Sequence, residues 1–175
     1  MISSEFLAQN STYIENLMRH HFIYDVSRLL LLRQDPELVT VLRSEVDDAG
    51  VDLVMTFRKV TRQIQMKTLA KATTNNPYSV AESLSGIAGG CVIWTCYDRE
   101  TLNPTHYHLM GGPGSAPMRD LTQFPQATKK KNGVKVPRAG YRTIKIRDAE
   151  FQGLKLEQLV NVLFDLPSAP DRNAS

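Results

Sequence analysis

A nearly continuous apolar run from Cys91 to Tyr97 is the feature that most restricts the fold of this chain. Its length is typical of a strand, and Gly89-Gly90 directly before it would break a helix. A strand that is apolar at successive positions has no side that suits solvent, so it belongs at the centre of a sheet covered on both faces. This run therefore predicts a layered domain built around one buried strand.

The segments around this strand predict an α/β fold. A helix is expected from Ser11 or Thr12, as the cap, to about Arg33, where Asp35-Pro36 follows. After it we expect strands over 39–42, 51–57 and 62–68, a short helix over 79–87, the buried strand, a strand over 107–110, a Gly- and Pro-rich turn over 111–117, a mobile loop around the lysine run and Gly133, an edge strand over 142–147 and a helix over 156–164. The sequence thus predicts an α/β single domain with a central mixed sheet of four to six strands flanked by helices.

Length and composition agree with one domain. At 175 residues, with 42% hydrophobic and 22% charged residues, the chain can bury a core without metal or disulfide staples. We expect a domain over 1–166, with a core at about 11–97 and a basic extension over 98–166, and a flexible tail over 167–175. No apolar run is long enough to cross a bilayer and no secretion signal is visible at the start, so the expected location is cytoplasmic.

Two consecutive strand patterns carry polar groups that indicate chemistry. Asp52 lies inside the first. In the second, Gln63, Gln65 and Lys67 alternate with apolar residues and so share one face. Mg²⁺ prefers oxygen ligands and keeps several waters, so Asp52, the Gln65 side-chain oxygen and the Met66 carbonyl form a candidate ligand set. Lys67 is placed to neutralise charge on a phosphoryl group, although an ordinary hairpin with a solvent-facing polar side would show the same pattern.

These residues resemble the PD-(D/E)XK, or restriction-endonuclease-like, nuclease superfamily. An Asp-x-Gly-x-Asp turn at 48–52 followed by Gln-x-Lys at 65–67 on the next strand is similar to its motif, in the variant with Gln where Asp or Glu is commoner. The chain is also similar, from about Ile14 to Phe164, to a little-characterised bacterial group of that superfamily, through Arg62–Lys67, Gly89–Trp94, Gly111–Gly114 and Gly133–Lys135. The order of helix, three strands, helix and strand is the core order of the superfamily.

The resemblance assigns roles to four residues. Asp52 becomes the central metal-binding carboxylate, Gln65 a second ligand and Lys67 the catalytic lysine. Glu15 on the first helix matches the glutamate that many members direct into the same site. The implied cofactor is Mg²⁺ or Mn²⁺, and the implied reaction is hydrolysis of a phosphodiester bond by a water that the metal and Lys67 activate.

Gln65 is a departure from the commoner motif. A neutral amide binds a divalent cation more weakly than a carboxylate does, so either another acid compensates or metal binding is weak. The candidates for compensation are Glu15, Glu45 and Asp48. Asp48 has a second interpretation as the turn residue that precedes Gly50.

Positive charge gathers in the second half of the chain. Residues 1–100 carry 10 Lys and Arg against 12 Asp and Glu, whereas residues 101–175 carry 11 against 6. Between Arg119 and Arg147 the only acid is Asp120. Such a block suits a phosphate backbone, and the alternative is a solvated basic loop. The residues expected to bind nucleic acid are Lys129, Lys130, Lys131, Lys135, Arg138, Arg142 and Lys145. Tyr78 and Tyr141, near loops and basic residues, could stack on an exposed base.

The cysteines and histidines favour structural roles. Cys91 and Cys96 lie on opposite faces of one strand, so they predict buried, reduced thiols and no disulfide. His106 and His108 share a strand face, but no cysteine or acid stands at close ligand spacing along the sequence, so no zinc site is expected. His20 and His21, on the first helix, are expected to be structural.

The leading hypothesis is a Mg²⁺-dependent nuclease acting on DNA, with defence against foreign DNA as its biological setting and a homodimer as one form suited to double-strand cutting. The alternative is a nucleic-acid-binding or assembly module that keeps the fold without catalysis. A purely protein-binding subunit is a third hypothesis. Motifs for ATP, NAD and serine-hydrolase chemistry are absent from the sequence.

Overall fold

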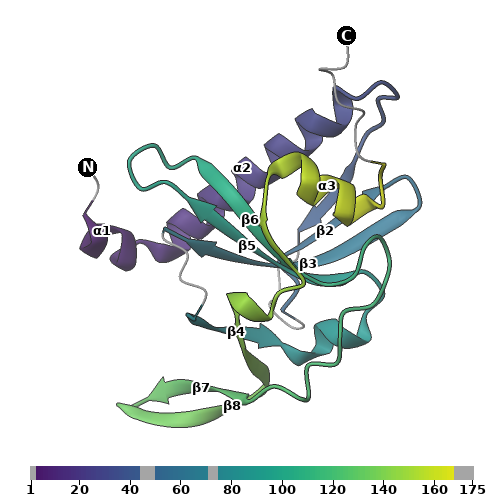
Figure 1. The fold of residues 1–175 in the computed structure, drawn as a ribbon. Coiled ribbons are helices and arrows are strands. Elements are labelled where there is room, and N and C mark those ends of the chain that lie inside the picture. The colour runs from purple at the N-terminus through teal and green to yellow at the C-terminus, as the bar shows by residue number, and fades with distance from the viewer. Residues whose placement is uncertain (1–2, 44–49, 71–74, 168–175) are drawn as a thin grey trace.

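The computed structural model describes residues 3–43, 50–70 and 75–167, and Figure 1 shows their arrangement. A six-stranded sheet in the order β1-β2-β3-β5-β6-β9 forms its centre. The strands are β1 (Thr40–Arg43), β2 (Leu53–Phe57), β3 (Val60–Leu69), β5 (Gly90–Tyr97), β6 (Pro104–Met110) and β9 (Phe151–Leu154). Strands β3 and β5 run parallel and the other neighbours run antiparallel. The predicted α/β class and mixed sheet are confirmed.

Strand β5 occupies the place that its composition predicted. Every residue of the strand is buried, and it lies between β3 and β6 near the middle of the sheet. Cys91 and Ile93 belong to the core on one face, whereas Val92, Trp94 and Cys96 belong to the core on the other. The two cysteines are free and buried on opposite faces, as predicted.

Three α-helices are described, α1 (Ser4–Gln9), α2 (Ser11–Leu31) and α3 (Leu156–Phe164). Helices α2 and α3 cover one face of the sheet (Figure 1). Helix α2 buries a residue at every fourth position, namely Ile14, Met18, Phe22, Val26 and Leu30. Asn10 precedes α2 as its N-cap, so the expected capping by Ser11 or Thr12 is wrong. The reason is α1, which delivers the chain to Asn10 and leaves Ser11 inside the helix.

A second, three-stranded sheet in the order β4-β8-β7 covers the opposite face. Its strands are β4 (Pro77–Ala81), β7 (Gln126–Lys131) and β8 (Val134–Lys145). The short 3-10 helices η1 (Glu82–Gly86), after β4, and η2 (Ile146–Asp148), after β8, connect this sheet to β5 and β9 of the main sheet. Val80, Leu84 and Ile144 from this layer pack with Trp94 of the main sheet. Within the described residues, α-helices therefore flank the main sheet on one side and a second sheet flanks it on the other.

Three predicted elements differ from the structure. The segment 79–87 is not an α-helix, because Val80 and Ala81 pair with β8 in strand β4 and only η1 follows. The lysine run is not a mobile loop, because it forms β7 and pairs with β8. The segment 142–147 is not an edge strand, because β8 lies between β4 and β7.

Several predictions fall outside the described residues. They concern Glu45, Asp48 and the part of the tail from residue 168 onward. Among the helices that are described, none combines the length and apolar character that a membrane-spanning helix needs.

Candidate functional site

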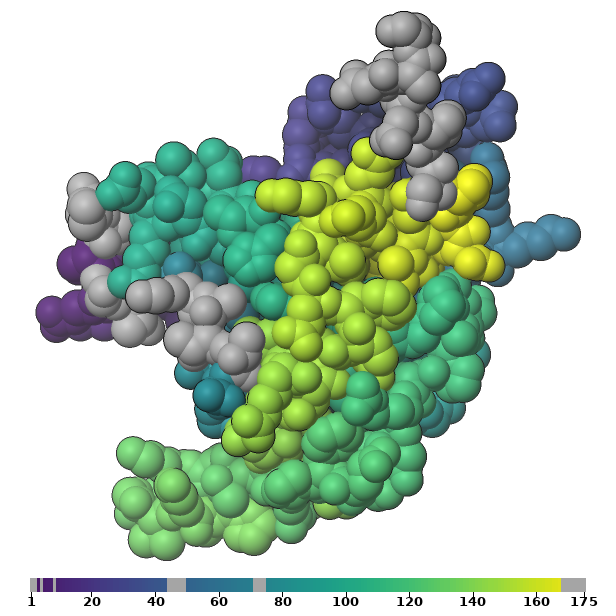
Figure 2. All heavy atoms as spheres, viewed as in Figure 1, coloured from purple at the N-terminus to yellow at the C-terminus, as the bar shows by residue number. Residues whose placement is uncertain are grey.

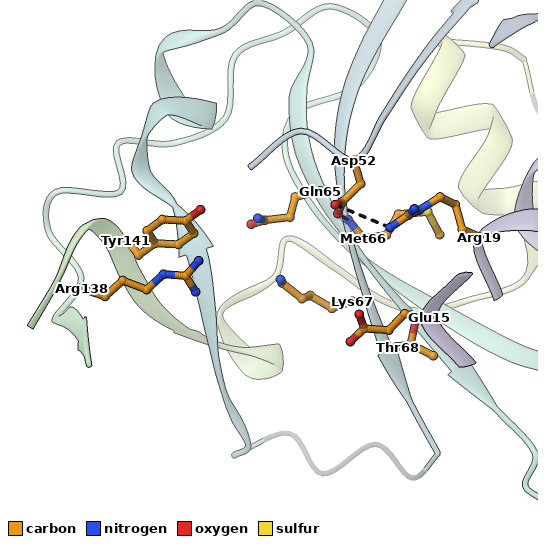
Figure 3. A pocket seen from close by; sticks show the side chains of 9 residues that line it. All are labelled: Glu15, Arg19, Asp52, Gln65, Met66, Lys67, Thr68, Arg138 and Tyr141. Atoms are coloured by element: carbon orange, nitrogen blue, oxygen red, sulfur yellow. Dashed lines mark hydrogen bonds and ion pairs between the residues drawn. The ribbon is translucent and has the colours of Figure 1, made fainter. Parts of the chain in front are cut away.

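One pocket gathers the residues that the motif singles out. It has a volume of about 160 Å³ and is lined by Glu15, Arg19, Asp52, Gln65, Met66, Lys67, Thr68, Arg138 and Tyr141. Figure 3 shows these side chains converging from α2, from the residue before β2, from β3 and from β8. All four predicted catalytic residues, the predicted Met66 ligand and one residue of the basic block thus line the same cavity.

Strand β3 has an open edge at the pocket because its partner β2 is shorter. The pairing of β2 with β3 begins at Leu53 and Ile64, so β3 extends past the end of β2. Asp52 occupies this edge: its N–H donates to the Ile64 carbonyl at 2.9 Å, and its Oδ2 accepts from the Met66 N–H at 2.7 Å. The N–H and C=O of one strand residue point to the same side. The Met66 carbonyl therefore faces the same edge as the Asp52 carboxylate.

Arg19 is a pocket residue that the sequence reasoning missed. Its Nη2 lies 3.7 Å from Asp52 Oδ1, and the Asp52 side chain is 27% exposed. That separation exceeds the length of a charge-assisted hydrogen bond, so Arg19 offsets the negative charge of Asp52 without fixing its second oxygen. The signal was available in the helical spacing, because Arg19 stands four residues after Glu15 and so shares its face of α2.

Gln65 is almost completely buried, with 3% of its surface exposed. Its Oε1 accepts a hydrogen bond from the Ala81 N–H at 3.1 Å, which ties β3 to β4. A Cβ added to Gly50 would lie only 2.8 Å from Gln65 Nε2, so the chain passes closely over this amide. Gln65 is thus a structural link between the two sheets, and its amide oxygen keeps a second lone pair.

Lys67 and Glu15 lie on one side of the pocket, and Arg138 and Tyr141 of β8 lie on the other (Figure 3). The Arg138 guanidinium carbon is 3.5 Å from the centroid of the Tyr141 ring, which is cation–π contact distance. The lining carries two carboxylates against three cations, namely Arg19, Lys67 and Arg138. The pocket therefore suits an anion alongside a cation held by its carboxylates.

The remaining predicted nucleic-acid-binding residues lie on the second sheet. Lys129, Lys130 and Lys131 belong to β7, and Lys135, Arg142 and Lys145 belong to β8. The β7–β8 hairpin extends from the body as an arm (Figure 2), and Lys130 pairs directly with Lys135. Arg142 differs from the others, because its Nε donates to Glu82 Oε2 at 2.7 Å. Tyr78 is half-buried and packs edge-on against Trp94 rather than standing in the pocket.

The structure also brings Cys96 beside His106 and His108. Their potential ligand atoms all lie within 4.8 Å of one another. No cysteine stands at close ligand spacing to these histidines along the sequence, but antiparallel pairing sets Cys96 opposite His106 in space. The reason for expecting no zinc site is therefore wrong. Burial raises the pKa of the Cys96 thiol to about 11. Burial, with a smaller contribution from His106, lowers the pKa of His108.

No protein-family model matches this chain, and no curated protein matches it. The resemblance to the PD-(D/E)XK superfamily therefore stays a prediction.

Proposed function

We propose that this protein is a divalent-metal-dependent nuclease that hydrolyses phosphodiester bonds in DNA. The observation that carries the proposal is the shared pocket. Asp52, Gln65, Lys67 and Glu15 come from different elements, and one cavity accommodates all four with the edge of β3 that carries the Met66 carbonyl. If the polar residues of β3 only faced solvent, as in an ordinary hairpin, a glutamate from helix α2 would not be expected in the same cavity as Lys67.

The donor set fits Mg²⁺ or Mn²⁺. Both ions favour carboxylate, carbonyl and water oxygens, and one or two carboxylates suffice when substrate phosphate and water complete the shell. Asp52, the Met66 carbonyl and Gln65 would hold the ion, and Glu15 supplies the second carboxylate of the lining. When bound, the ion supplies Lewis acidity at a phosphoryl oxygen.

The remaining chemistry belongs to charged side chains of the chain itself. Lys67 places an ammonium group in the pocket, where negative charge grows on the phosphoryl oxygens during hydrolysis. Glu15, which lies on the same side (Figure 3), would accept a proton from the attacking water. Arg138 faces them from β8 and would bind a neighbouring phosphate.

The β7–β8 hairpin supports a nucleic-acid substrate. Like charges placed opposite each other on a ladder destabilise the pair, and Lys130 and Lys135 are so placed. A polyanion would relieve this repulsion and release counterions. Arg138 belongs to the same strand as Lys135, so β8 carries basic residues from the hairpin to the pocket lining. The homodimer suggested for double-strand cutting stays a prediction.

The first test combines calorimetric titration of Mg²⁺ and Mn²⁺ with a plasmid-nicking assay, on wild type and Asp52→Asn. Removing the carboxylate charge should lower metal affinity more than ~10-fold, because the loss of a residue that only supports a metal ligand already has an effect of that size. The nicking rate should fall with the metal affinity. Asp35→Asn is the matched control, because Asp35 is exposed and lies outside the pocket lining. Equal metal binding and nicking in wild type and Asp52→Asn would contradict the proposal.

A second candidate function is a nucleic-acid-binding module without catalysis. Two contacts favour it, because both occupy groups that a metal ion would need. Arg19 provides a cation beside Asp52, and the Gln65 side-chain oxygen accepts a hydrogen bond from the Ala81 N–H. This candidate predicts a salt-sensitive gel shift that needs no divalent metal and that occurs without nicking in Mg²⁺ or Mn²⁺. The same wild-type samples therefore separate the two functions.

Gln65→Glu tests whether this residue is a metal ligand. A carboxylate binds Mg²⁺ more strongly than an amide, and its oxygen can still accept from Ala81, so Mg²⁺ affinity should rise about tenfold in calorimetric titration. Gln63→Glu adds the same charge on the same strand outside the pocket lining and should have little effect. Equal increases in both variants would mean that overall charge, and not coordination by residue 65, sets the affinity.

A further inference from the structure

A cluster of Cys96, His106 and His108 lies on the main sheet outside the candidate pocket. Cys96 belongs to β5 and the two histidines belong to β6, where Cys96 pairs with His106 and Trp94 pairs with His108. Lys67 pairs with Trp94 from the other side, so Lys67 and His108 stand two strands apart. At ~4.8 Å between strands this separation is about 10 Å. The cluster is therefore spatially separate from the candidate pocket, although both lie on the same face of the sheet.

We propose that Cys96, His106 and His108 form a binding site for a borderline-soft transition metal, with Zn²⁺ as the favoured ion. One thiolate and two imidazoles are ligands that zinc prefers and Mg²⁺ does not. Their ligand atoms lie within 4.8 Å of one another. Tetrahedral zinc with these ligands needs separations of about 3.3 to 3.6 Å, which follow from its bond lengths and which small side-chain rotations would reach.

The hydrogen bonds of His106 prepare it for coordination. The Thr105 hydroxyl donates to the Cys96 carbonyl at 3.1 Å, so its oxygen is left to accept from His106 Nδ1–H at 3.0 Å. This contact holds the ring proton on Nδ1 and leaves the Nε2 lone pair available. Histidine ligands of zinc are typically oriented by such a bond to the other ring nitrogen.

His108 supplies a second, independent indication of a ligand. The residue is 5% exposed, and its Nε2 is buried without a hydrogen-bonding partner among the described residues. Its Nδ1 accepts from the Gly153 N–H at 3.3 Å. Coordination at Nε2 would place the ring proton on Nδ1 and give up this one long hydrogen bond. The Nε2 atom of His108, which has no hydrogen-bonding partner among the described residues, would then bind the metal.

The geometry also defines what kind of zinc site this is. Three protein ligands leave the fourth coordination position of a tetrahedral zinc ion open to water or to an atom of another molecule. Structural zinc sites differ, because protein ligands fill all four positions. His106 is half-buried and gives access from solvent, whereas Cys96 is 2% exposed. Binding would convert the Cys96 thiol to a thiolate and release its proton to solvent.

The test uses full-length protein stripped of metal and titrated with Co²⁺ and then Zn²⁺ in the presence of excess Mg²⁺. We expect one equivalent of Co²⁺ with a thiolate-to-cobalt charge-transfer band, and its stoichiometric displacement by Zn²⁺. Cys96→Ala should abolish the charge-transfer band. His106→Gln should keep the fold, because the ring is partly exposed, and should weaken binding more than ~10-fold. Thermal unfolding of each variant checks that it is folded.

Three controls separate this site from other sources of binding. Cys91→Ala removes the other cysteine, on the opposite face of β5, and His20→Gln removes an exposed histidine of α2. Both variants should bind like wild type, and so should Asp52→Asn. The proposal is overturned if wild type shows no charge-transfer band at one equivalent, if folded His106→Gln binds as tightly as wild type, or if only Asp52→Asn loses binding. None of these outcomes depends on nuclease activity.

Discussion

Replacing Lys67 with methionine is expected to slow Mg²⁺-dependent plasmid nicking by a factor of about 10² to 10³. Lys67 extends from β3 into the pocket that holds Asp52 and Glu15. A fixed positive group beside a phosphoryl centre interacts more strongly with the transition state than with the ground state, because negative charge grows there during the reaction. Methionine has a similar length and removes the charge. The nicking rate at saturating DNA measures the effect.

Lys59→Met is the matched control for this prediction. Lys59 is an exposed lysine in the turn between β2 and β3, and it loses the same charge outside the pocket. Its nicking rate should stay within a few-fold of wild type. Gel shifts without divalent metal should show similar DNA binding in wild type and both variants, since most phosphate contacts are assigned to the hairpin. Wild-type nicking by a folded Lys67→Met variant would remove Lys67 from the mechanism.

The parts of the fold that sequence predicted correctly are those where local pattern and burial agree. The apolar run at 91–97 became the buried strand β5. The predicted helix over 156–164 has the bounds of α3. In the alternating strand β3, Ile64 and Met66 joined the helix-side core while Gln65 and Lys67 faced the pocket, as their period of two requires.

In the β7–β8 hairpin, the lysine run and the Asn132-Gly133 turn favour different local structures. Lysine is a poor strand former, so the run 129–131 favoured a loop. Asn132 and Gly133 have φ of +50° and +78°, which suits the two-residue type I′ turn that Asn-Gly favours between paired strands. The segment 79–87 failed for a different reason: its pairing partner lies about 60 residues later in β8, and no local pattern encodes such a partner.

The same limit applies to side chains that meet across strands. Glu15 lines the pocket. Only the family resemblance led us to expect it there, because nothing in the spacing of Asp52 and Lys67 required a helix residue nearby. Cys96 and His106 are ten residues apart, and they meet because β5 and β6 pair in one register. A shift of one residue would have turned His106 to the other face. Constellations that depend on register therefore become visible only in the folded chain.

Gly50→Ala is expected to lower the free energy of unfolding by about 2 to 4 kcal/mol, from left-handed backbone strain of ~1–2 kcal/mol and steric overlap. Gly50 has φ of +69°, and an added Cβ would lie 2.3 Å from Ala81 Cβ and 2.8 Å from Gln65 Nε2. For a chain of this size the melting temperature should fall by about 5 to 15 °C. Relief of the overlap requires residue 50 to move away from Ala81 and Gln65, or these two residues to shift, and a shift of either one would strain the hydrogen bond between them.

Gly133→Ala and Gly86→Ala are controls that separate the two causes of the stability loss in Gly50→Ala, namely backbone strain and steric overlap. Gly133 has φ of +78° with no atom within 4 Å of an added Cβ, so Gly133→Ala carries the backbone strain alone. Gly86 has open space and no positive φ, so Gly86→Ala should be neutral or slightly stabilising. Thermal denaturation should therefore rank Gly50→Ala well below Gly133→Ala, with Gly86→Ala at or above wild type. Equal losses for Gly50→Ala and Gly133→Ala would mean that nothing packs tightly over Gln65, and the link between the two sheets at the pocket would then be loose.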